Sequence, residues 1–274
     1  MQEFYRGVWV VAYREMLRFV QDRSRMISSF AFPLMFLVVF GAGFNRIVGS
    51  LEGDVDFIQF MYPGIIAMTV TMSSLFAGLS VVWDKEFGFL KELMVAPISR
   101  AGIVVGKAIG GGATAMCQGA IMLVLAPVLG VSLSLTLVAK LVPMVLVLSL
   151  TLSGLGILLG SRMRSQQGFQ VVMQLLVFPL IFLSGVFFPI NGVPPWMQVI
   201  AKLNPLTYGV DAIRQAFLGG SSAPQAILPS NDGVMLGVTV FGHMMTALED
   251  MIVVGVLGVA LMSLAVWSFS RQES

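Results

Sequence analysis

The chain has 274 residues, of which 57% are hydrophobic and only 11% are charged. Soluble globular domains carry about a quarter of charged residues, so these proportions exclude an ordinary water-soluble core. The net charge of +2 is not gathered into a basic patch, which argues against nucleic acid as a partner.

The N-terminal segment, residues 1–26, carries five arginines among apolar residues such as Phe4, Trp9 and Tyr13. Their helical spacing gives one apolar face and one basic face, which is typical of a helix lying along a membrane interface. We expect this helix on the cytoplasmic side. The alternative is a signal peptide cleaved near residues 41–43, but its leader would be too long and would contain acidic residues.

Six charge-free apolar windows follow, each about long enough to cross the hydrocarbon core as a helix. They are residues 27–44, 61–83, 108–129, 141–160, 169–188 and 251–269. The sequence therefore predicts an all-α integral membrane protein, with one six-span domain over residues 27–269.

The orientation of this domain follows from its basic residues, most of which precede the first window or follow the second and fourth windows. Lysine and arginine are retained in the cytoplasm, so both termini, including the tail 270–274, are predicted to be cytoplasmic. Lys107 and Lys140 stand at predicted span ends, where a long side chain can reach the interface. We therefore expect no charged residue away from the ends of a span.

The internal loop between the second and third windows, residues 84–102, mixes charged and apolar residues at helical spacing. Phe87, Leu90, Leu93 and Met94 would form one apolar face, and Pro97 would end the helix. Such a short surface helix can dock into a groove of a cytoplasmic partner. The alternative is that the same face presses into lipid.

Residues 189–218, after the fifth window, favour two short amphipathic helices over 195–204 and 206–217. Each is too short to cross a membrane, so we expect a helical hairpin that is re-entrant or lies at the outer interface. Trp196 and Tyr208 would lie at the depth of the lipid headgroups. An ordinary external loop is the alternative.

Polar residues inside the windows are the candidates for a substrate path. Hydroxyl groups in spanning helices usually bond a backbone carbonyl, whereas a glutamine cannot satisfy both ends of its amide within its own helix. The candidates are Thr71, Ser74, Gln118 and Gln174.

The sequence contains few residues of the types that usually carry out catalysis. With one cysteine, Cys117, and one histidine, His243, the sequence offers no usual metal-ligand set and no Ser/His or Cys/His pair. Residues Gly102–Lys107 are one residue short of a phosphate-binding loop, and Ala108 stands where that loop needs Ser or Thr. We expect no catalytic residue, no metal and no cofactor on this chain.

Three segments resemble the permeases of the ABC-2 type transporter family. The internal loop is similar to the family's E-x-G…L…(V/A)-x-P-(I/L)-S-R pattern, and Tyr62–Gly64 and Asn204–Tyr208 also look like that family. The matching loop residues are Glu86, Gly88, Leu90, Leu93, Pro97, Ser99 and Arg100, followed by Gly106 and Lys107. The resemblance is greatest to permeases of daunorubicin-type drug exporters, with nodulation-factor and polysaccharide exporters close behind.

This resemblance implies a permease subunit in a bacterial or archaeal cytoplasmic membrane, exporting drugs or other amphipathic molecules. Two permease chains, identical or different, would pair with two copies of a separate ATPase that holds ATP and magnesium. Export of a polysaccharide or lipid-linked saccharide is an alternative, and an ion-coupled secondary carrier is another. The implied ATPase-coupling residues are Lys85, Glu86, Phe87, Gly88, Leu90, Leu93, Met94, Pro97 and Arg100. The implied external gate comprises Trp196, Asn204, Pro205 and Tyr208.

Overall fold

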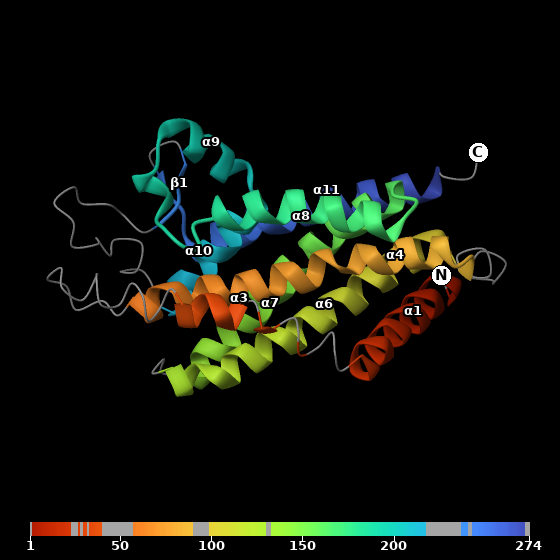
Figure 1. Cartoon of the computed structure of the whole chain (residues 1–274), viewed down its shortest axis with the longest axis horizontal. Coiled ribbons are helices and arrows are strands. Elements are labelled where there is room, and N and C mark those ends of the chain that lie inside the picture. Colours follow the sequence, from red (N-terminus) through yellow and green to blue (C-terminus); the bar gives the residue numbers. More distant parts are fainter. Residues whose placement is uncertain are drawn as a thin grey trace, which may run out of the picture.

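The computed structural model describes residues 2–22, 27, 30–31, 33–39, 57–89, 99–129, 133–217, 237–240 and 243–271. Within these ranges the chain is a bundle of helices that run mostly along the long axis of the molecule (Figure 1). The helices are α1 (Gln2–Gln21), α3 (Phe57–Leu75), α4 (Ala77–Glu86), α6 (Arg100–Leu125), α7 (Leu135–Arg162), α8 (Gln166–Phe182), α9 (Pro195–Leu203), α10 (Pro205–Phe217) and α11 (Ala247–Ser270). Two 3-10 turns (Ala126–Leu129 and Ile190–Gly192) and an antiparallel pair, β1 (Thr239–Val240) with β2 (His243–Met244), complete the described elements.

Four helical segments are long and apolar enough to cross a membrane, so the predicted all-helical membrane fold is confirmed and the predicted six spans only in part. The four are Met61–Glu86, Arg100–Leu125, Leu135–Arg162 and Ala247–Ser270. The fifth predicted span corresponds to α8, which is apolar but has only 17 residues. Much of the first window, 27–44, lies outside the described residues.

The spanning helices begin earlier than the apolar windows because serine and threonine residues cap them. The Ser99 hydroxyl accepts a hydrogen bond from the Gly102 amide at 3.1 Å, so α6 starts at Arg100 and not at residue 108. In the same way, Ser134 caps α7 and Thr246 caps α11. Consequently Lys107 lies inside a spanning helix, which corrects its expected place at a span end.

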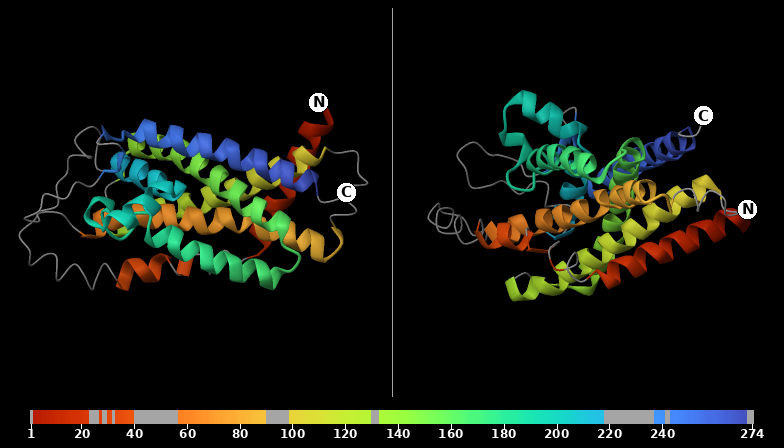
Figure 2. Two further views of the ribbon diagram at one scale, coloured as in Figure 1. Left: turned by 90° about the horizontal axis from the view of Figure 1, so that it is seen from above. Right: turned by 45° about the vertical axis from the view of Figure 1, so that its right-hand side comes forward.

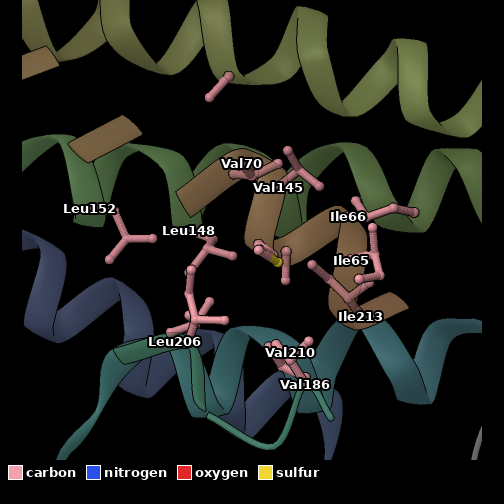
Figure 3. Packing of buried hydrophobic residues seen from close by; sticks show 14 of the residues in the cluster. Ile65, Ile66, Val70, Val145, Leu148, Leu152, Val186, Leu206, Val210 and Ile213 are labelled. Atoms are coloured by element: carbon pink, nitrogen blue, oxygen red, sulfur yellow. The ribbon is translucent and has the colours of Figure 1, made fainter. Parts of the chain in front are cut away.

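The core lies between α3, α7 and α10. Figure 3 shows Val70 of α3 beside Val145 of α7, and Ile65 of α3 beside Ile213 of α10, with Val210 of α10 also in the group. At the other end of the bundle, α4 and α7 cross closely at Gly78 and Gly156, where an added Cβ would overlap the backbone of the opposite helix. Small residues allow this approach in spanning helices.

The predicted hairpin over 189–218 contains two helices, α9 and α10, at the expected places. α9 exposes Trp196, whereas α10 is almost wholly buried among α3, α7 and α11. Asp211 and Arg214, on the polar side of this amphipathic helix, are each only 3% exposed. Both sides of α10 are therefore covered by protein.

Candidate functional site

Helix α1 docks into a groove of glycines on α6. Gly102, Gly106 and Gly110 are spaced by four residues and therefore share one face of α6. A Cβ at Gly106 would lie 2.9 Å from the Val8 carbonyl oxygen, and one at Gly102 would lie 3.0 Å from the Phe4 carbonyl oxygen. The segment Gly102–Lys107, which does not have the spacing of a phosphate-binding loop, therefore belongs to a surface on which another helix packs.

The contacts along this groove run in the same direction on both helices, so α1 is parallel to the first turns of α6, as Figure 2 shows. The expected amphipathic helix is present, and its apolar face points away from the bundle: Tyr5, Trp9 and Tyr13 are more than half exposed. Its other face is not simply solvated, because Arg14 turns toward α4.

A network of buried ion pairs joins α1, α4 and α6 beside this groove. Lys107 of α6 is 1% exposed, and its Nζ lies 2.5 Å from Asp84 Oδ2 and 2.7 Å from Ser80 Oγ of α4. From α1, Glu15 Oε1 lies 3.4 Å from Lys107 Nζ, and Arg14 Nη2 lies 2.6 Å from Asp84 Oδ2. Two cations and two anions are therefore matched in the buried part of the network.

The two residues that α1 contributes to the network, Arg14 and Glu15, are ionised at physiological pH. Burial by itself would raise the pKa of Glu15, but Lys107, the Ser80 hydroxyl and Arg14 outweigh burial and hold the pKa of Glu15 at about 2. Burial opposes the charge of Arg14 as well, yet Asp84 and Glu15 raise the pKa of Arg14 above its ordinary value. The arrangement is an electrostatic clamp, formed by Arg14, Glu15, Ser80, Asp84 and Lys107.

The coupling residues predicted from sequence lie where this network meets the internal loop. Lys85 Nζ donates to the Ser161 carbonyl, and Glu86 Oε2 accepts from the Gln166 amide at 3.1 Å, at the N-terminus of α8. Gly88 has a φ of 75°, a left-handed conformation that favours glycine.

At the two ends of this loop, Phe87 is 78% exposed and the Arg100 guanidinium donates to the Ser270 carbonyl at 3.1 Å, in the last turn of α11. The remaining predicted coupling residues lie outside the described part of the chain. They are Leu90, Leu93, Met94 and Pro97.

An open cavity of about 600 Å³ separates the C-terminal end of α1 from the end of α4. It lies directly beside the clamp, because Arg18 and Asp84, which approach to 3.6 Å, both line it. The lining combines charged and aromatic side chains: Arg18, Gln21, Asp22, Trp83, Asp84, Phe87 and Phe89. The cytoplasmic end assigned from sequence therefore presents a recess next to the exposed Phe87.

The predicted gate residues have distinct places at the opposite end of the bundle. Asn204 caps α10 by accepting from the Leu206 amide at 3.0 Å, and its Nδ2 donates to the Leu180 carbonyl at 2.7 Å, near the end of α8. Pro205 is the first residue of α10, where a missing amide hydrogen costs nothing.

Tyr208 is 7% exposed, and its hydroxyl donates to the Lys202 carbonyl at 2.7 Å. Trp196 is 64% exposed. Of the two aromatic residues expected at the lipid headgroups, only Trp196 therefore presents its ring to the surroundings.

Of the four substrate-path candidates, three are buried and one is exposed. Thr71 and Ser74 are fully buried, and each hydroxyl donates to a carbonyl of its own helix. Gln118 is buried in α6, whereas Gln174 is exposed on α8. An apolar crevice lies elsewhere, between the helical residues 33–39, α3 and α8. Its described lining is Phe36, Met68, Met72, Val177, Phe178, Ile181, Phe182 and Phe187.

Sequence reasoning missed the clamp, although two local signals pointed to it. Ser80 and Asp84 are four residues apart and hence on one face of α4. Lys107 follows Gly106 directly, inside the run of glycines at four-residue spacing. No local pattern in the sequence indicates that these residues face Glu15.

Comparison with known proteins gives consistent matches. Residues 6–218 match the ABC-2 type transporter family. The chain is 31% identical over 218 residues to ycf38 of Cyanophora paradoxa, named as a transport permease, covering 77% of this chain and 74% of that protein. It is 29% identical over 203 residues to the inner membrane transport permease YadH of Escherichia coli K12, covering 70% and 76%. It is 27% identical over 198 residues to Nodulation protein J of Rhizobium leguminosarum bv. viciae, covering 72% and 76%.

Proposed function

Since the chain belongs to the ABC-2 type transporter family, we propose that it is the permease subunit of an exporter whose ATPase is a separate chain. Two permease chains, identical or different, would assemble with two ATPase subunits that carry ATP and magnesium. The membrane would be the bacterial or archaeal cytoplasmic membrane, with both termini of the chain inside the cell.

The observation that carries this proposal is the clamp at the start of the internal loop. Asp84 is held by Lys107 of α6 and Arg14 of α1, and two residues later Glu86 holds the N-terminus of α8. A force applied to the loop therefore reaches several helices through buried ionic contacts. Such contacts favour a shift between two packed arrangements over a gradual deformation.

The ATPase would dock at the recess between α1 and α4. Phe87 is exposed at its edge, and the Arg14 guanidinium lies 5.0 Å from the centre of the Phe89 ring, which ties the loop to α1. An exposed aromatic residue beside a charged recess is a common anchor at protein interfaces. In this arrangement α1 and the loop 84–102 are both contacted by the ATPase.

The substrate class that we propose is a drug or another amphipathic small molecule. The crevice between residues 33–39, α3 and α8 has a free volume of only about 20 Å³, so it supports this class through the chemistry of its lining and not through its size. The described lining is entirely methionine, phenylalanine and branched aliphatic side chains. Methionine adapts its shape to different apolar ligands. A saccharide would need polar partners for its hydroxyl groups, and the described lining of the crevice supplies none.

An ion-coupled carrier needs an ionisable group that changes its charge during transport. The structure places charged residues inside the spanning helices, against our expectation, so their supposed absence no longer argues against a carrier. The cytoplasmic clamp is nevertheless unsuited to proton coupling, because the pKa of Glu15 is held at about 2. Transport that responds to a proton gradient and not to ATP would favour the carrier.

Co-purification tests the proposed docking site. The full chain serves as bait in a detergent extract, and wild type is compared with Phe87→Asp. Because Phe87 is exposed, this change leaves the packing of the bundle intact. The matched control is Trp196→Asp, an exposed aromatic residue at the opposite end. We expect a nucleotide-binding chain to accompany wild type and the control and to be lost from Phe87→Asp; recovery of that chain with all three baits would rule out this docking site.

A further inference from the structure

A second group of buried polar residues joins α10 to α11, at the end of the bundle opposite the clamp. Asp211 of α10 is 3% exposed, and Asp250, in the first turn of α11, is fully buried. The Nε2 atom of Gln215 lies 3.2 Å from Asp211 Oδ2 and 3.2 Å from Asp250 Oδ2. The two carboxyl groups, from two different helices, therefore face the same amide nitrogen.

This group holds more acceptors than donors. The side-chain amide of Gln215 has two hydrogens, yet its nitrogen faces both carboxylates and the Met245 carbonyl at 3.0 Å. The Val238 amide donates to Asp211 Oδ2 at 2.9 Å. Within the part of the chain that the structure describes, no donor reaches the buried Oδ1 atom of Asp250. Two ionised carboxylates can only accept hydrogen bonds, so a proton on one of them would supply the donor that this group lacks.

The charges around the two aspartates also favour a proton on one of them. Arg214 of α10 is the nearby cation, and its guanidinium donates to the Gly185 carbonyl at 2.7 Å. With both carboxylates ionised, Asp211, Asp250 and Arg214 would leave one uncompensated negative charge in a buried region, which is costly. Burial accordingly raises the pKa of Asp211 above its ordinary value.

Among the residues that the structure describes, the other titratable groups near the pair do not supply the missing positive charge. From α11, Glu249 adds negative charge, and His243 of β2 contacts Glu249 at 3.3 Å on the exposed side. Tyr208 of α10 and Tyr62 of α3 are neutral phenols that donate to backbone carbonyls. α7 faces α10 with the apolar Leu148. The helix dipole at the start of α11 favours ionised Asp250, so one proton in the pair, and not two, best balances these charges.

We propose that Asp211 and Asp250 share one proton, and that this proton holds α10 against α11. Removing the proton leaves two carboxylates that repel each other inside the protein, so α10 separates from α11 as the pH rises. The outer hairpin is then closed at neutral pH and loosened at alkaline pH. This inference is independent of the energy source for transport, because it concerns only contacts within the chain.

The sign of the pH effect on stability follows from linkage. A shared proton means that the native chain keeps at neutral pH a proton that the unfolded chain has released, so the equilibrium constant for unfolding rises with pH. The rise approaches tenfold for each pH unit per proton and ends once the native pair has ionised. If the pair acted through packing alone, substituting either aspartate would lower stability by the same amount at every pH.

The test is thermal and denaturant unfolding of the full chain in lipid nanodiscs between pH 6 and pH 9. We expect the unfolding constant of wild type to rise with pH, and Asp250→Asn to flatten the rise, because an amide holds its hydrogens at every pH. Asp211→Asn should behave in the same way and serves as a second variant if the first does not fold. The matched control is Glu249→Gln, an adjacent exposed carboxylate that also contacts His243; this control should keep the wild-type slope.

A local readout complements the unfolding curves. Arg214 is buried, so trypsin cleaves after it only when α10 separates from the bundle. We expect cleavage of wild type to increase between pH 7 and pH 9 relative to Asp250→Asn at each pH. A wild-type unfolding constant that does not change with pH, or one whose slope is the same in Asp250→Asn, would overturn the shared proton.

Discussion

Lys107 Nζ lies 2.5 Å from Asp84 Oδ2, and the two side chains are each only 1% exposed. A lysine in a spanning helix is tolerated when its charge is paired within the protein. The pair joins α6 to the end of α4, where the internal loop begins. It therefore connects the part of the permease nearest the proposed ATPase to the spanning helices.

Removing the lysine should be strongly destabilising. Lys107→Met leaves Asp84 and Glu15 buried with only Arg14 and Arg18 to balance them, and a broken buried pair typically costs about 3–5 kcal/mol. The measurement is the free energy of unfolding in detergent. Combining Lys107→Met with Asp84→Asn should cost less than the sum of the two single changes, with a coupling of about 0.5–3 kcal/mol. Strict additivity would show that the two residues do not interact.

The glycine groove predicts a contrast between two glycines. Gly106→Ala places a Cβ 2.9 Å from the Val8 carbonyl oxygen, and such overpacking costs about 1–3 kcal/mol. In Gly255→Ala, the new Cβ meets its nearest atom, Val147 Cγ1, only at 3.9 Å, so stability should be unchanged or slightly higher. Gly106→Ala should also speed trypsin cleavage after Arg14 as α1 detaches. Equal unfolding midpoints for the two variants would argue against the groove.

The contribution of Glu15 should not change across physiological pH. Its pKa falls from 4.5 in the unfolded chain to about 2 in the folded chain, so its contribution is complete above about pH 4.5 and is lost as the pH falls toward 2. The difference in unfolding midpoint between wild type and Glu15→Gln should therefore be constant from pH 8 to pH 5.5. A difference that disappears near pH 6 would mean that Glu15 is not held by Lys107 and Arg14.

Asn204 should contribute through two separable hydrogen bonds. Asn204→Ala loses the cap of α10, worth about 1 kcal/mol, and also the donor to the Leu180 carbonyl, for a total of about 1–3 kcal/mol. Asn204→Ser keeps a capping hydroxyl but is too short to reach Leu180, so its unfolding free energy should lie between wild type and Asn204→Ala. Trp196→Ala, an exposed change in the same hairpin, should stay within about 0.5 kcal/mol of wild type.

Local signals predicted the helices of the hairpin over residues 189–218 well. Pro195 and Pro205 each open a helix, and the breaks between the helices lie within a residue of the expected ones, because these signals depend on neighbours in the chain. The start of α6 was misplaced because a search for charge-free windows stops at Lys107. The residue that caps this helix, Ser99, lies eight residues earlier.

The burial of charged residues could not be predicted in the same way. Lys107 is stabilised by Glu15, which is 92 residues away in the sequence. Asp211 accepts from the Val238 amide and from Gln215, which also donates to Asp250 of α11. Pairings of this kind depend on which helices become neighbours, and the periodicity of one segment does not determine that. The glycines at 102, 106 and 110 were the available clue that a helix packs on α6 at this point.

The central claim is that transport through this chain is driven by a separate ATPase acting on the internal loop. The most direct measurement is uptake of a fluorescent amphipathic drug into inside-out proteoliposomes, with the permease alone or with the ATPase that co-purifies with it. The account predicts no ATP-dependent uptake by the permease alone, uptake with both chains and ATP, and loss of uptake in Phe87→Asp. Drug uptake by the permease alone, unchanged by ATP, would contradict it.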